Sequence, residues 1–152
     1  LENGMYKNIL VAIDDSETSR CALKEALHIA KESNAKLYIT HVVDEILLNM
    51  HGHAMLDMGN AAKAASNLVQ AGQKLVDEAM QSATGIDAEA LIVEARDRRI
   101  SETIADKARE LGADLIIIGR HGQRGLATFI LGSVAEQLAR IADASVLLVR
   151  KH

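Results

Sequence analysis

The chain has 152 residues, of which 49% are hydrophobic and 25% charged, with a formal net charge of −4, which is the composition of one soluble domain with a substantial core. The acidic balance argues against a nucleic-acid or anionic-membrane surface, and two Tyr, one Phe and no Trp leave few rings on which bases could stack. The single Cys21 excludes an internal disulfide framework and indicates a reducing, cytoplasmic compartment. No stretch approaches the roughly 18 uninterrupted apolar residues of a membrane span. Residues 1–4, LENG, precede Met5 and are expected to be a remnant of an expression tag outside the domain.

Short apolar runs rich in β-branched residues alternate along the chain with longer amphipathic segments. The short runs predict strands and the longer segments predict helices. In chain order these are a strand at 8–14, a helix at 16–33, a strand at 35–44, a helix at 61–83, a strand at 87–95, a helix at 99–112, a strand at 113–119, a helix at 133–142 and a strand at 144–150. Ser16 and Ser133 are expected N-caps, and Gly112 is an expected C-cap.

The predicted strands are apolar on both faces, which is typical of a mostly parallel sheet covered by helices on both sides. We therefore expect one α/β domain over residues 5–152, a three-layer sandwich whose five-stranded parallel sheet has the strand order 3-2-1-4-5. The last strand would lie at an edge of this sheet, yet residues 146–149, VLLV, are too apolar for a solvated edge. We expect residues 145–150 to pair with the same strand of a second copy in a homodimer. The alternative is that a helix covers this edge.

The segment 45–60 is long for a connection between a strand and a helix, and such loops are usually lids or disordered. It contains three Met residues and the pair His51 and His53. Imidazole is a common metal ligand, but this pair is an incomplete site and no Cys supplies a third ligand. We favour a mobile flap that folds over a pocket or a partner, with metal binding as the alternative.

Ligands of open parallel sheets bind beyond the carboxyl ends of the strands, so residues there are candidates for a site. The first strand ends in Asp14, the second in His41-Val42-Val43 and the fourth in a run from Gly119 to Gly122. Glycines let backbone N–H groups converge on an anion, and Gly132-Ser133 opens a helix whose N-terminus carries unpaired N–H groups. The stretch 119–133 is thus a predicted anion site. It lacks a Walker lysine, and its glycines follow the wrong strand for a dinucleotide fingerprint.

The spacing of these glycines is more specific than their number. Gly119, two residues, Gly122, nine residues, Gly132 and then Ser133 form a Gly-x2-Gly-x9-Gly-Ser pattern. In this pattern, together with KNILVAIDDSETS near the start, ELGADLIIIGRHG before the glycines and SVLLVR at the end, the chain resembles the universal stress protein family from about Met5 to its C-terminus. The pattern is typical of the branch of that family that binds ATP.

The resemblance implies a cytoplasmic α/β protein that forms a homodimer through its last strand and acts as a nucleotide-dependent regulator of the stress response. The implied ligand is ATP, with ADP or AMP as alternatives, and a divalent cation such as Mg²⁺ would accompany the phosphates. By matching motif positions, Ala12 and Ile13 would line the adenine pocket, Asp14 would contact ribose or adenine, and Val42 would hydrogen-bond adenine through its backbone. Ribose and phosphates would be held by Gly119, His121, Gly122, Gly132, Ser133 and Val134.

Two departures from the family pattern bear on this pocket. Some members carry Pro where this chain has Ala12, a mild change because Ala also leaves room for a base. Many members carry Gly near the end of the third strand, where this chain has the bulkier EARDRRIS over 94–101. Its Arg96, Arg98 and Arg99 either approach the phosphates or make salt bridges.

Several candidate residues also have plain structural interpretations. Asp14 could simply precede the first helix, the glycine loop could be a tight turn without a ligand, and His41 in an apolar strand is more often a hydrogen-bonded core histidine than a ligand. For Arg120 and Arg124 we favour solvent exposure over phosphate pairing. Cys21, on a helix, is expected to be an inert packed thiol.

Two other functions fit parts of the sequence. A slow ATPase or autophosphorylating protein is the alternative to a regulator, although fast phosphoryl transfer needs positioned charge and an oriented nucleophile that the sequence does not supply. A phospho-acceptor receiver domain would use the acidic pair Asp14-Asp15 and Asp97. Receivers end in a helix after the fifth strand, however, and the glycine spacing would be unexplained. We favour the regulator.

Overall fold

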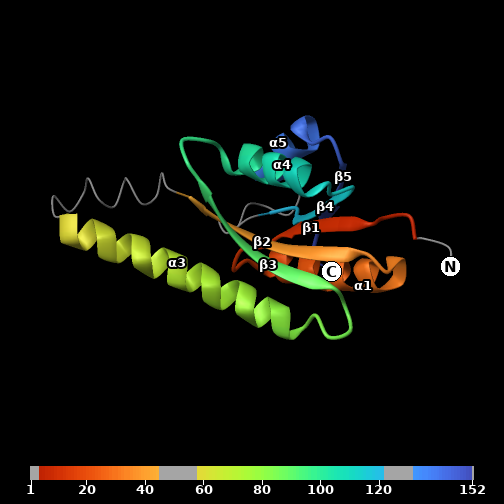
Figure 1. Ribbon diagram of the computed structural model, residues 1–152. Coiled ribbons are helices and arrows are strands. Elements are labelled where there is room, and N and C mark those ends of the chain that lie inside the picture. Colours follow the sequence, from red (N-terminus) through yellow and green to blue (C-terminus); the bar gives the residue numbers. More distant parts are fainter. Residues whose placement is uncertain (1–3, 45–57, 122–131, 152) are drawn as a thin grey trace.

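The computed structural model describes residues 4–44, 58–121 and 132–151. These residues form the predicted strands and helices in the predicted order (Figure 1). The strands are β1 (Asn8–Ala12), β2 (Lys36–Asp44), β3 (Ala88–Ala95), β4 (Leu115–Gly119) and β5 (Ser145–Val149). The helices are α1 (Glu17–Ser33), α3 (Met58–Gln81), α4 (Ile100–Leu111) and α5 (Ser133–Ile141).

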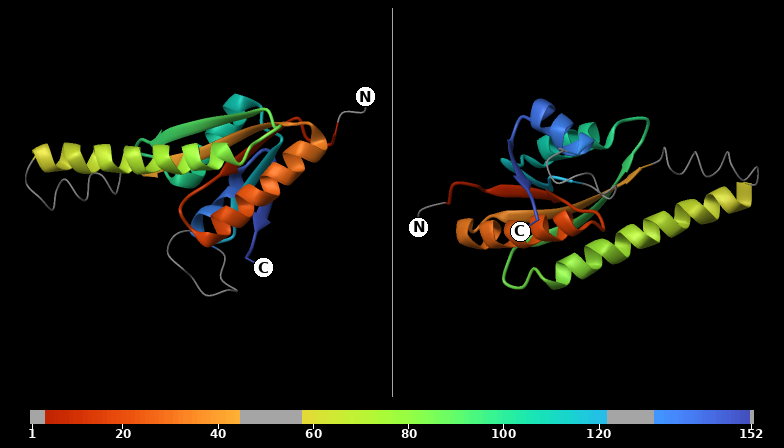
Figure 2. Two further views of the ribbon diagram at one scale, coloured as in Figure 1. Left: turned by 90° about the horizontal axis from the view of Figure 1, so that it is seen from below. Right: turned by 180° about the vertical axis from the view of Figure 1, so that it is seen from behind.

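All five strands pair in parallel in one sheet with the order β3-β2-β1-β4-β5, as predicted. Helices α1 and α3 cover one face of this sheet, and α4 and α5 cover the other (Figures 1 and 2). The domain is therefore the expected three-layer α/β sandwich. Strand β1 lies between β2 and β4 at its centre, and β3 and β5 are its edges.

The alternation of side chains along β1 explains why this strand is apolar throughout. Ile9 and Val11 are buried in the core that α1 and α3 share with the sheet, whereas Leu10 and Ala12 are buried on the side of α4 and α5. Successive side chains of a strand point to opposite faces, and here each face has its own helical cover. Strand β4 repeats the alternation. The two cores fix the positions of the strand ends, on which the site depends.

The predicted connection over 45–60 ends earlier than expected, because α3 begins at Met58. Residues 45–57, with His51 and His53, lie outside the described residues, so the flap and metal interpretations do too. Residues 58–60 belong to α3, although Gly59 and Asn60 favour turns in isolation. The Ala-rich sequence that follows has a high helix propensity, and the helix therefore extends toward the N-terminus to include residues 58–60. With 24 residues α3 is long, yet no helix among the described residues is apolar enough over sufficient length to cross a membrane.

Two of the three predicted helix caps are confirmed. Ser16 Oγ caps α1 by accepting from the Ser19 N–H at 3.2 Å, and Gly112 ends α4 with a left-handed φ of 65°. Ser133, however, is not the N-cap of α5. The cap is Gly132, whose carbonyl accepts the first helical bond from the Glu136 N–H at 2.9 Å. Glycine is itself an accepted N-cap, and this moves Ser133 to the first helical position.

The start of α1 packs directly onto Gly119, the last residue of β4. A Cβ atom at Gly119 would lie 2.7 Å from Thr18 Oγ1, 3.0 Å from the Thr18 carbonyl carbon and 3.1 Å from the Ser19 amide nitrogen. The Thr18 hydroxyl also donates a hydrogen bond to the His121 carbonyl. Because Gly119 has no side chain, the first turn of α1 and the start of the glycine loop can meet here.

Val76→Ala should lower the free energy of unfolding by about 2 kcal/mol, because the Val76 side chain on α3 is 1% exposed and packs against the sheet. Val69→Ala is the matched control, since it is the same substitution on the same helix at a side chain that is 38% exposed. It should change the free energy by no more than about 0.5 kcal/mol. Urea denaturation measures both. Equal effects would contradict the packing of α3 described here.

Gly119→Ala should lower the free energy of unfolding by about 1–3 kcal/mol, because the added methyl group has no room beside Thr18. Thr18→Ala alone should cost about 1 kcal/mol through the lost hydrogen bond to His121. The double variant should lose less than the sum, because Thr18→Ala removes the closest of the three contacts. Strictly additive losses in the same denaturation assay would show that the two residues do not touch.

Candidate functional site

A tight turn connects the end of β1 to α1, and Asp14 holds it together. The Asp14 N–H donates to Ser19 Oγ at 2.8 Å, and Asp14 Oδ1 accepts from the Ser16 N–H at 2.8 Å. One carboxylate oxygen of Asp14 therefore has the structural role of fixing the turn before α1. The side chain is half-buried at the carboxyl edge of the sheet. Contact of its second oxygen with ribose or adenine stays a prediction.

His41 lies on β2 beside this turn and is held by the protein itself. Its Nδ1 lies 2.8 Å from the Ile13 carbonyl oxygen. Its ring packs against α3, where a Cβ atom at Gly72 would come within 2.7 Å of His41 Cδ2. These contacts agree with the structural interpretation of His41, because the imidazole joins the end of β1 to β2 and α3.

Val42, one residue further along β2, presents its backbone to the space beyond β1. The ladder between β1 and β2 ends where the Ile13 N–H donates to the Thr40 carbonyl at 2.8 Å. Alternate residues of a strand direct their backbone groups to the same neighbour, so the N–H and C=O of Val42 point past the end of β1. The Val42 side chain packs on the α4 and α5 face with Ala12. Ile13 instead turns its side chain into the core of the opposite face.

The two ends of the glycine loop are held together by backbone hydrogen bonds. The Arg120 N–H donates to the Val149 carbonyl at 2.6 Å, which extends the pairing of β4 with β5. The Arg120 carbonyl accepts from the Gly132 N–H at 2.9 Å. The loop therefore leaves and returns at one point of the sheet edge, and Gly132 starts α5 directly from there.

His121 is the last described residue before the loop. Its carbonyl accepts from the Thr18 hydroxyl. Its Nδ1 is buried and has no hydrogen-bond partner within residues 4–44, 58–121 and 132–151. Buried polar atoms nearly always have a partner, so this nitrogen is available to a ligand or a water molecule. Gly122, the next predicted site residue, lies outside the described part of the chain.

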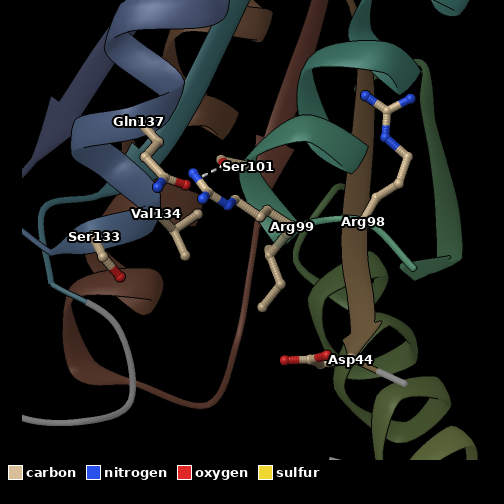
Figure 3. A pocket seen from close by; sticks show the side chains of 8 residues that line it. Asp44, Arg98, Arg99, Ser101, Ser133, Val134 and Gln137 are labelled. Carbon is tan, nitrogen blue, oxygen red and sulfur yellow. Dashed lines mark hydrogen bonds between the residues drawn. The ribbon is translucent and has the colours of Figure 1, made fainter. Parts of the chain in front are cut away.

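A pocket of about 260 Å³ opens at this edge of the sheet on the face of α4 and α5 (Figure 3). It lies between the end of β2 and the first turns of α4 and α5. The residues that line it are Asp44, Arg98, Arg99, Ile100, Ser101, Ser133, Val134 and Gln137. Two helix N-termini, each with unpaired N–H groups and a partial positive charge, thus border one pocket.

Predicted and unpredicted residues meet in this pocket. Ser133 and Val134 are predicted site residues, and Val134 packs in the same apolar cluster as Ala12 and Val42. Sequence reasoning missed Asp44, Ile100, Ser101 and Gln137. The signal for the first three was their position, since Asp44 ends β2 and the other two open the helix after β3 at the same edge. Gln137 follows Ser133 by one helical turn and accepts a hydrogen bond from Ser101 Oγ at 2.7 Å.

Two arginines of the bulky segment after β3 make salt bridges. Arg96 Nη2 lies 3.1 Å from Glu94 Oε2. Arg98 Nη1 lies 2.7 Å from Asp106 Oδ2, and its Nε lies 3.8 Å from Glu102 Oε2. For these two residues the salt-bridge interpretation is confirmed.

The structure bears on the receiver and metal alternatives only through the residues that it describes, which do not include His51 and His53. Asp97, which a receiver domain would phosphorylate, lies exposed in the turn between β3 and α4 with a left-handed φ of 50°. No three His, Cys, Asp or Glu side chains within the described ranges are arranged to hold a metal ion.

Comparisons with known sequences agree with the family resemblance. The model of the universal stress protein family matches residues 5–150. The universal stress protein YxiE of Bacillus subtilis (strain 168) is 31% identical over 151 residues, which are 96% of this chain and 100% of that protein.

Solved structures show the same architecture. Protein MJ0577, solved as a hypothetical protein, superposes with a TM-score of 0.80 and 25% identity over 97% of this chain and 98% of its own. A universal stress protein solved in complex with cAMP superposes with a TM-score of 0.64 and 28% identity over 95% of this chain and 97% of its own. The family match spans every described strand and helix and both ends of the glycine loop. The chain belongs to the universal stress protein family.

Proposed function

We propose that this protein is a cytoplasmic regulator that works by binding ATP, with ADP or AMP as alternative ligands. One observation carries the proposal. The Gly-x2-Gly-x9-Gly-Ser segment begins and ends at one point of the sheet edge, where the Gly132 N–H meets the Arg120 carbonyl at 2.9 Å. Such a point, at the carboxyl ends of parallel strands and at a helix N-terminus, is suited to an anion. The relative solved with cAMP, at 28% identity, supports an adenine nucleotide as that anion.

The adenine ring would lie against Ala12 and Val42. Both side chains belong to the apolar cluster on the α4 and α5 face, and the Val42 backbone offers a donor and an acceptor beyond the end of β1. A flat apolar surface with a few fixed polar groups is the usual environment of a bound base. Ile13 would contribute only its backbone, because its side chain lies in the opposite core. Asp14 would contact the ribose with the carboxylate oxygen that the turn leaves available.

The phosphates would follow the glycine loop to the start of α5. Gly119, Gly122 and Gly132 would give access to backbone N–H groups, and Ser133 and Val134 open the helix at the pocket. The His121 Nδ1, which has no hydrogen-bond partner among the described residues, lies at the start of the same loop. The pocket of about 260 Å³ is smaller than the roughly 300–1,000 Å³ of sites that enclose a whole ligand, so it would take one part of the nucleotide. A divalent cation such as Mg²⁺ would accompany a triphosphate.

Ser133→Glu should abolish the thermal stabilisation of the protein by ATP and Mg²⁺. The new carboxylate would repel phosphates at the pocket, while a negative charge in the first turn suits the helix itself. For the unchanged protein, ATP at a hundredfold excess over its Kd should add about 2.7 kcal/mol of stability. The measurement is the melting temperature with and without ATP, with GTP as the base control.

Ala139→Glu is the matched control for Ser133→Glu, because it adds the same charge to an exposed position of the same helix away from the pocket. It should keep the full response to ATP. A full response in Ser133→Glu as well would place the phosphates away from α5. No response in the unchanged protein, together with no nucleotide released on heat denaturation, would contradict the proposed function.

We further propose that the protein is a homodimer joined through β5. β5 is an edge of the sheet, and Val146, Leu147 and Leu148 remain only half-buried in one chain. The Val149 carbonyl accepts from Arg120 and so points to β4. By alternation, the N–H groups of Val146 and Leu148 point outward and are free to pair with a second copy.

Val146→Pro should convert the homodimer into a folded monomer, since proline removes an outward N–H without touching the ladder to β4. Val146→Thr keeps the N–H and should remain dimeric. Light scattering coupled to size-exclusion chromatography gives the mass, and circular dichroism reports the fold. A dimer of unchanged stability in Val146→Pro would exclude edge pairing at β5.

A further inference from the structure

The pocket beside α4 and α5 is lined by an arginine, Arg99, whose charge no described residue neutralises. Of the three arginines between β3 and α4, Arg96 pairs with Glu94, and Arg98 pairs with Asp106 and Glu102. Arg99 lines the pocket and makes no ion pair with any residue of the described ranges. Charged side chains that line pockets without a partner are candidates for contact with a ligand.

The backbone of Arg99 is fixed although its side chain is exposed. Its N–H donates to Glu102 Oε2 at 3.1 Å, and its carbonyl accepts from the Thr103 N–H at 3.0 Å and from Thr103 Oγ1 at 3.0 Å. These bonds form the first turn of α4 and anchor the Cα atom at the rim of the pocket. The guanidinium group can therefore bind a ligand without reordering the chain.

The directions of the two neighbouring side chains differ (Figure 3). Arg99 extends across the pocket toward α5, to the region of Ser101 and Gln137, whereas Arg98 points away along α4 toward its carboxylate partners. Ser101 and Gln137 satisfy each other through a hydrogen bond of 2.7 Å. Neither supplies a charge to Arg99.

The remaining charge in the pocket is Asp44, at the end of β2. Asp44 has an interaction of its own, and no salt bridge joins it to Arg99 among the described residues. Near α5, the pocket thus combines the Arg99 guanidinium with the N-terminus of the helix that starts at Ser133. Both favour negative charge, and a guanidinium matches the geometry of phosphate oxygens.

We infer that Arg99 contacts a phosphate group of the bound nucleotide and sets the preference of this site for phosphorylated over unphosphorylated nucleosides. The inference rests on the proposed function, because it assigns a specificity residue within the same site. Arg98, one position earlier, has no such role because its charge is already compensated on α4.

The test compares the affinities of AMP and adenosine for the unchanged protein, Arg99→Gln and Arg96→Gln at one ionic strength. Arg99→Gln should weaken AMP binding about tenfold, the loss expected for a hydrogen bond to a charged group at a partly exposed position. Its affinity for adenosine should change less than about twofold, because the nucleoside does not reach the guanidinium. Arg96→Gln, the same substitution at an arginine that does not line the pocket, should change neither affinity. Isothermal titration calorimetry gives both constants.

These affinities distinguish a failure of the role of Arg99 from a failure of nucleotide binding itself. An unchanged AMP affinity in Arg99→Gln, or equal losses for AMP and adenosine, would overturn the role of Arg99 and leave nucleotide binding intact. Equal losses would mean that Arg99 only shapes the pocket. An unchanged protein that binds neither AMP nor adenosine, nor ATP with Mg²⁺, would overturn the proposed function and this inference with it.

Discussion

At the end of β4, Gly119 has no side chain, and the first turn of α1 packs onto its backbone. This contact joins two parts of the chain that are about a hundred residues apart in sequence. It places the Asp14 turn beside the start of the glycine loop, and the hydrogen bond from Thr18 to the His121 carbonyl secures the junction. The Cβ atom of any larger residue at position 119 would collide with the first turn of α1 and displace it. The candidate site therefore depends on the absence of one methyl group.

The strand order explains why the site lies at this junction. After β1 the chain turns through α1 toward β2, and after β4 it turns through α5 toward β5, on the opposite face. Adjacent strands whose connections depart in opposite directions leave a space between them at the carboxyl edge. In this protein β1 and β4 are such a pair, and the Asp14 turn, the two ends of the glycine loop and the Val42 backbone lie at the carboxyl edge of the sheet near them. The fold itself thus supplies a place for a ligand.

Most of the fold, and two of the residues that line the pocket, Ser133 and Val134, could be predicted from the sequence, because both depend on local patterns. Apolar runs give strands, and the spacing from Gly119 to Ser133 marks the loop. What could not be predicted depends on tertiary neighbours. No local rule decides that Gly132 rather than Ser133 caps α5, or that the side chain of Ile13 belongs to the opposite core. The membership of Gln137 in the pocket follows from how α4 packs against α5.

The three arginines after β3 show this limit most clearly. In sequence they are equivalent, yet the left-handed turn at Asp97 and the start of α4 direct Arg98 to carboxylates and Arg99 to the pocket. Exposed ion pairs contribute about 0–1 kcal/mol each, so the pairs of Arg98 matter little for stability. Their consequence is electrostatic, because they compensate the charge of Arg98 and leave Arg99 without an ion pair among the described residues. For a protein that responds to nucleotide occupancy, the Kd must lie near the ligand concentration, and a second free arginine would strengthen phosphate binding and saturate the site. In the proposed site, the compensation of Arg98 by α4 would therefore keep phosphate binding weak enough to be reversible.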